Sequence, residues 1–109
     1  MRIALVRLIA VSGAALLLAA CISDPNKPHP DLARVWNAFL ALPAERALAI
    51  AGDPRRDRWV TGASGGHESR EEAEDGALAE CRRRRAERRI QDACRLYATG
   101  DEVVWTGPQ

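Results

Sequence analysis

Apolar and polar residues follow a helical period shortly after residue 30. Between Asp31 and Ala41, apolar side chains recur at spacings of three and four, the period of an amphipathic helix. Pro43 prevents the helix from continuing, because proline lacks the amide hydrogen. We expect this helix to pack on the domain core rather than to serve as a detachable segment for a partner. Its apolar residues are Leu32, Val35, Trp36, Phe39 and Leu40.

Two apolar segments then flank a tight polar turn. Residues 46–51 have the alanine and leucine content of a helix, yet their alternation also suits a buried strand. The turn at 52–57 contains glycine, aspartate and proline, and residues 58–61 have the pattern of a strand. We therefore favour a hairpin, followed by a flexible glycine-rich loop over Gly62–His67.

The clearest predicted helix begins after Ser69. Ser69 and Glu72 form a capping box, in which each side chain accepts a hydrogen bond from the backbone of the other residue. Acidic residues follow the cap and arginines precede Gln91, as the helix dipole favours. The helix is expected to end near Gln91 and to bury a narrow apolar face, formed by Ala73, Ala77, Leu78, Cys81 and Ile90.

Residues 94–98 have the pattern of a strand. Alternation places Cys94, Leu96 and Ala98 on one face, and Arg95 and Tyr97 on the other. A turn at 99–101 and a short edge strand at 103–105 are expected to follow. The order of elements predicts an α+β fold over residues 32–109, with an N-terminal helix, a β-hairpin, a long helix and C-terminal strands forming a small helix-on-sheet domain.

The first twenty residues have the layout of a secretory signal peptide. Arg2 and Arg7 precede an apolar run over residues 8–20, which is shorter than the roughly 18 residues of a membrane anchor. The run ends in Leu18-Ala19-Ala20-Cys21, which resembles the lipobox of bacterial lipoproteins. The resemblance implies cleavage before Cys21, acylation of that cysteine, and attachment to the membrane through the lipid.

A proline-rich tether over residues 21–31 is expected to link this lipid to the domain. Ile22, rather than aspartate, follows the lipobox cysteine. In many Gram-negative lipoproteins this pattern favours the outer membrane over the inner membrane, so we expect a location on the periplasmic face of the outer membrane.

The chain has three cysteines. If Cys21 carries lipid, then Cys81 and Cys94 remain as an even pair in an oxidising compartment, which predicts a disulfide. A zinc site is the alternative, but it needs about four ligands. The other candidates are His29, His67 and carboxylates at unsuitable spacing, so no metal or cofactor is expected.

Short motifs between residues 46 and 100 form a recognisable set: Ala49-Ile50-Ala51, Trp59, Gly62, Ser64, Ala73, Ala77-Leu78, Cys81 and Cys94. In this order they resemble a small disulfide-bearing bacterial envelope domain family of unknown function. The resemblance implies export and a disulfide, and it implies no reaction. The arginine-rich end of the long helix departs from the family pattern.

Charge and candidate catalytic residues narrow the function classes. Without Arg2 and Arg7, 14 of the 16 basic residues remain against 15 acidic ones, so no basic excess points to nucleic acid. Ser64 and Ser69 have His67 nearby, but they lack the strand-to-helix elbow of a nucleophilic serine. We therefore expect no enzyme.

The most suggestive surface feature is a run of arginines, which has two interpretations. It is either a solvated helix end favoured by the dipole, or an anion-binding patch for lipid phosphates, lipopolysaccharide or an acidic protein face. The expected function is a non-catalytic envelope lipoprotein that binds or scaffolds an envelope component. The alternative is an inhibitor or immunity-type lipoprotein that blocks a lytic or envelope enzyme through Gly62–His67. The arginines are Arg82, Arg83, Arg84, Arg85, Arg88 and Arg89.

Overall fold

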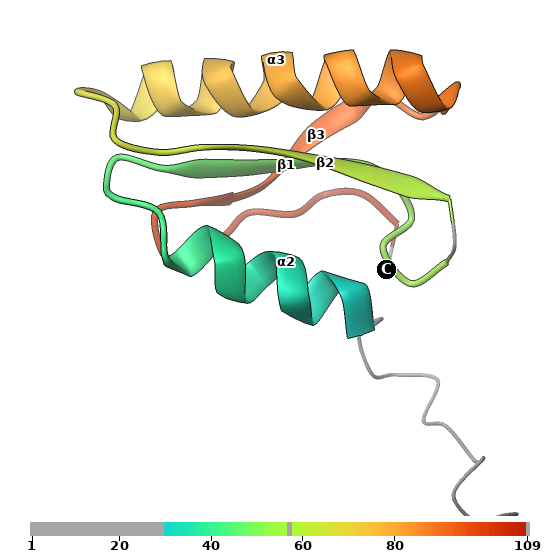
Figure 1. Ribbon diagram of the computed structural model, residues 1–109, viewed down its shortest axis with the longest axis horizontal. Helices are drawn as coiled ribbons and strands as arrows, with labels where there is room; N and C mark the ends of the chain where they lie inside the picture. Colours follow the sequence, from blue (N-terminus) through green and yellow to red (C-terminus); the bar gives the residue numbers. More distant parts are fainter. Residues whose placement is uncertain (1–29, 57, 109) are drawn as a thin grey trace, which may run out of the picture.

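A computed structural model describes residues 30–56 and 58–108, which form three layers (Figure 1). Helix α2 (Pro30–Leu40) covers one face of a four-stranded antiparallel sheet, and helix α3 (Arg70–Arg88) covers the other. The strands lie in the order β2-β1-β3-β4. The predicted α+β fold is confirmed. The strands are β1 (Ala47–Gly52), β2 (Trp59–Ser64), β3 (Cys94–Thr99) and β4 (Glu102–Val103).

The predicted signal peptide, Cys21 and most of the tether lie outside the described residues. Within the residues that are described, no helix is long and apolar enough to cross a membrane.

Strand β1 is buried along its whole length because it is an inner strand with a helix on each face. Ala47, Ala49 and Ala51 belong to the core cluster under α3, whereas Leu48 packs with Phe39 of α2. Burial on both faces explains why the sequence of this strand lacks a clear polar alternation. The hairpin interpretation of residues 46–61 is confirmed by the antiparallel pairing of β1 with β2.

The expectation of a flexible loop over Gly62–His67 is wrong for its first half. Gly62–Ser64 continue strand β2, and the hydroxyl of Ser64 donates a hydrogen bond to the carbonyl of Ala73 in α3. The second half is held by the backbone: Glu45 and His67 exchange hydrogen bonds of 3.1 and 3.2 Å. Gly62 serves close packing, since a Cβ at this position would lie 2.2 Å from the amide nitrogen of Cys81.

A β-bulge changes the predicted faces of β3. Leu48 pairs with Ala98 and Ala49 pairs with Leu96, so Tyr97 is the extra residue. Leu96 therefore faces α3, as expected, but Ala98 faces α2 with Leu48. The prediction that Ala98 shares a face with Cys94 and Leu96 is wrong, because the bulge shifts the alternation by one residue.

The start of α3 agrees with the prediction, whereas its end and the final strand differ slightly. The hydroxyl of Ser69 accepts a hydrogen bond from the amide of Glu72 at 3.1 Å, which confirms Ser69 as the N-cap. The helix ends at Arg88, before the predicted Gln91, and Arg89 closes it in a left-handed conformation with φ 54°. Strand β4 stops at Val103, and Trp105 instead packs against Tyr97, with ring centroids 5.7 Å apart.

Candidate functional site

The predicted disulfide is present. Cys81 of α3 is bonded to Cys94 at the start of β3, with their Cα atoms 6.1 Å apart. Neither cysteine is then a free thiol for nucleophilic attack or for zinc, so the zinc alternative fails. Across residues 30–56 and 58–108, no group of three or more histidine, cysteine or acidic side chains is close enough to hold a metal.

The six arginines of the basic end of α3 (Arg82–Arg89) have different contacts. Arg83 donates hydrogen bonds to Glu80 and to Glu87, at 2.6 and 2.8 Å for the shortest contact with each, and Arg84 donates to Glu80 at 2.9 Å. The hydrogen bonds from Arg83 hold the pKa of Glu80 below its ordinary value. These contacts account for two arginines as parts of ion pairs on the helix surface.

Arg85 has a structural role at the helix end. Its guanidinium donates to the carbonyls of Ile90 and Gln91, at 3.1 and 3.3 Å, so it holds the chain that leaves α3. By contrast, no hydrogen bond or ion pair with another described residue engages the side chains of Arg82, Arg88 and Arg89. The basic end is therefore partly structural and partly available to an anion.

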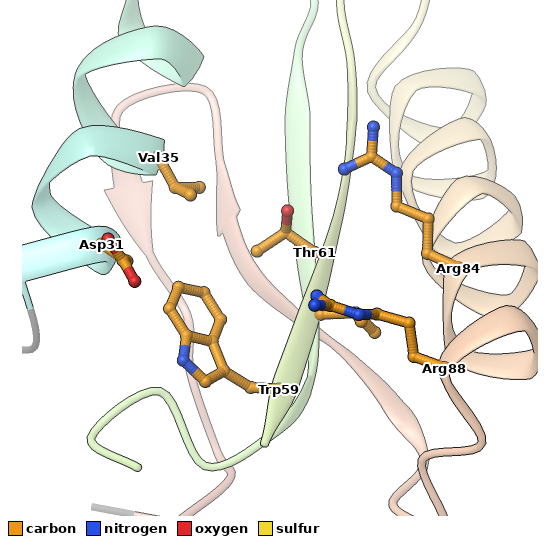
Figure 2. A pocket seen from close by; sticks show the side chains of 7 residues that line it. Asp31, Val35, Trp59, Thr61, Arg84 and Arg88 are labelled. Carbon is orange, nitrogen blue, oxygen red and sulfur yellow. The ribbon is translucent and has the colours of Figure 1, made fainter. Parts of the chain in front are cut away.

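A groove runs along the outer side of β2, between the two helices (Figure 2). We call it the edge groove, and its volume is about 270 Å³. Figure 2 shows Arg84 and Arg88 reaching from α3 towards β2, while the Trp59 ring lies on the α2 side of the strand. The residues that line it come from α2 (Asp31, Val35), β2 (Trp59, Val60, Thr61) and α3 (Arg84, Arg88).

A second hollow continues the edge groove at the end of α3. It has a volume of about 190 Å³ and is lined by Arg58, Trp59, Arg88 and Ile90, so Trp59 and Arg88 border both. Arg58 donates a hydrogen bond of 3.3 Å to the carbonyl of Arg89. One further arginine, Arg58, thus borders the hollow that continues the groove.

The arginines do not form a single patch. Arg82, Arg85 and Arg89 line a separate hollow of about 440 Å³, together with Gln91. That hollow is the larger one, but it lies only on α3 and the chain leaving it, whereas the edge groove joins both helices and the outer strand. We regard the edge groove as the candidate site. It combines Arg88, which has no ion pair with another described residue, and Arg84, which is paired with Glu80 through Nε, with an aromatic wall.

The serines and the histidine that were weighed as catalytic residues have structural contacts. Ser64 donates to a helix carbonyl and Ser69 caps α3, while His67 is half-buried beside Gly76. The groove residues Asp31, Val35, Trp59 and Thr61 were not predicted as a site. They lie on α2 and β2, more than 20 residues before Arg84, and each has an ordinary place in its own helix or strand pattern, so the sequence contains no local signal for them.

No family model, no curated protein and no solved structure matches the chain. The resemblance to a bacterial envelope domain family therefore stays a prediction, and any function has to be argued from the groove itself.

Proposed function

We propose that this protein is a non-catalytic lipoprotein of the bacterial envelope that holds an anionic envelope component in the edge groove. The single observation that supports the binding role is the convergence of Arg84 and Arg88 on the outer side of β2, opposite Trp59. Guanidinium groups form strong paired hydrogen bonds with carboxylates and phosphates, and an aromatic wall adds apolar contact.

The charge around the groove favours an anion. Residues 80–89 contain six arginines and two glutamates, an excess of four positive charges at this end of α3. The groove itself is lined by Arg84 and Arg88 against the single carboxylate of Asp31. Both glutamates form ion pairs with Arg83, and no ion pair with another described residue engages Arg88. The membrane attachment in this proposal rests on Cys21 and its lipobox-like surroundings.

The test compares two variants with the same change in charge. Full-length protein in detergent is passed over immobilised lipopolysaccharide and immobilised polyglutamate, at low and at moderate salt. Arg84→Gln/Arg88→Gln should weaken retention severalfold and reduce its sensitivity to salt, because exposed charges act over about 8–10 Å. The control variant, Arg82→Gln/Arg95→Gln, removes two exposed arginines outside the groove and should retain the wild-type behaviour.

Two outcomes would overturn the proposal. One is that neither probe retains the wild-type protein at low salt. The other is that the two double variants lose retention equally, which would mean that only the net charge matters. Circular dichroism of each variant establishes that the fold is intact.

A further inference from the structure

The outer side of β2 is an unpaired sheet edge. β2 stands at the end of the strand order β2-β1-β3-β4, and its inner side pairs with β1 over all six residues. No other strand in the described part of the chain pairs with its outer side. An edge of this kind presents backbone donors and acceptors that pair readily with another extended chain.

This edge lacks the features that usually protect one. Proteins cover sheet edges, shorten them, or place proline, lysine or a bulge there. β2 reads Trp-Val-Thr-Gly-Ala-Ser, with no charge and no proline, and its pairing with β1 has no register shift. The opposite edge, β4, is two residues long and contains Glu102. The contrast indicates that the β2 edge is kept open for an incoming strand.

The two walls of the edge groove specify what the incoming strand carries. Successive side chains of a strand point to opposite faces of the sheet. Those on the α3 face would meet Arg84 and Arg88, which suits carboxylates. Those on the α2 face would meet Trp59, Val35 and the acidic Asp31, which suits small or apolar side chains and opposes acidic ones.

A second copy of the protein does not fit this edge. α3 passes so close over β2 that a Cβ on Gly62 would lie 2.3 Å from the carbonyl oxygen of Ala77. Two β2 strands paired across the edge would be about 4.8 Å apart. In an antiparallel pair both α3 helices would lie on the same face of the joined sheet, and because each lies mainly over its own β2, they would have no more than the 8–10 Å that packed helices need. The occupant is therefore an extended segment without its own helix over the edge.

The tether of this chain is also a poor occupant. Pro25 and Pro28 lack the amide hydrogens that an added strand must donate, and Asp24 is balanced by Lys27. We propose that the β2 edge binds an extended acidic segment of another protein by strand addition, with acidic side chains at alternate positions facing Arg84 and Arg88. This inference rests on the proposed function and names the kind of partner.

The experiment uses fluorescent peptides of about six residues, the length of β2, and full-length protein in detergent. The probe alternates glutamate with valine, and the controls alternate glutamine or lysine with valine. Binding is measured by fluorescence anisotropy, and the Arg84→Gln/Arg88→Gln variant should bind the glutamate peptide about tenfold more weakly. The Arg82→Gln/Arg95→Gln variant should bind it as the wild type does.

N-methylation of the peptide separates strand addition from simple charge attraction. Two peptides are compared, one methylated on its odd-numbered amides and one on its even-numbered amides. The peptide whose methylated amides face β2 should not bind, and the other should bind nearly as well as the unmethylated peptide. Hydrogen exchange should also slow at those amides of Trp59–Ser64 that face away from β1 when the peptide binds.

Each other outcome counts against the inference. If binding depends on the two arginines but neither N-methylated peptide binds more weakly, strand addition is overturned and the proposed anion site remains. Equal binding of the lysine peptide would overturn the acidic partner. No binding of the glutamate peptide, with retention on lipopolysaccharide intact, would overturn this inference alone.

Discussion

At the scale of single residues, Gly62 decides how closely α3 approaches the sheet. A Cβ at this position would lie 2.2 Å from the amide nitrogen of Cys81 and 2.3 Å from the carbonyl oxygen of Ala77. Both are backbone atoms, so a rotamer change cannot relieve the contact, and the helix must move. We expect Gly62→Ala to lower the free energy of unfolding by about 2–3 kcal/mol, at the upper end of overpacking effects. Urea unfolding followed by circular dichroism measures the change.

Ala63 offers a matched control on the same strand. It is exposed, so Ala63→Ser adds one heavy atom without a clash and should change stability by less than about 0.5 kcal/mol. A Gly62→Ala protein as stable as Ala63→Ser would show that α3 does not approach β2 as closely as described.

At the scale of elements, the Cys81–Cys94 bond joins the middle of α3 to the start of β3 across 13 residues of chain. Closing a loop of this length lowers the entropy of the unfolded state, an effect of about 3 kcal/mol in the chain-entropy model. We expect Cys81→Ala/Cys94→Ala to lower the free energy of unfolding by about 2–5 kcal/mol, the range for small secreted domains. Denaturant unfolding of oxidised protein and of the double variant gives the difference.

Reduction of the wild-type protein provides the control for this experiment, because it breaks the bond without removing a side chain. Reduced wild type and the double variant should lose similar stability. Protein taken from the envelope with two thiols that react with an alkylating reagent would contradict the disulfide in the cell.

At the scale of the whole molecule, the proposal of an envelope lipoprotein depends on Cys21. Two acyl chains give stable membrane attachment, because each buried methylene contributes about 0.8 kcal/mol. We expect Cys21→Ser to give protein that is unprocessed or released from the membrane and that takes up no acyl label. Metabolic labelling with a fatty-acid analogue and membrane fractionation measure this.

The Cys81→Ala/Cys94→Ala variant is the control for Cys21→Ser, since it removes two other cysteines and should keep the label. Normal processing and equal membrane attachment of Cys21→Ser would rule out lipidation at this residue.

Local sequence patterns were sufficient for the elements and for the disulfide. The helical spacing from Leu32 to Phe39 and the capping box at Ser69 involve residues within a few positions of one another, so they do not depend on the rest of the fold. The cysteine pair followed from counting and from the compartment that the lipobox-like motif implies.

Features that depend on pairing and on helix placement were decided by the tertiary structure. The bulge at Tyr97 follows from the register between β1 and β3, and it reverses the face of Ala98. In the sequence, Gly62 indicated a flexible loop, whereas in the structure it allows α3 to lie close to β2. The sequence showed six arginines close together in the chain, but not which of them share a site. Only the crossing of α3 over the outer strand brings Arg84 and Arg88 to Trp59, because residues distant in the chain meet through packing that no local pattern encodes.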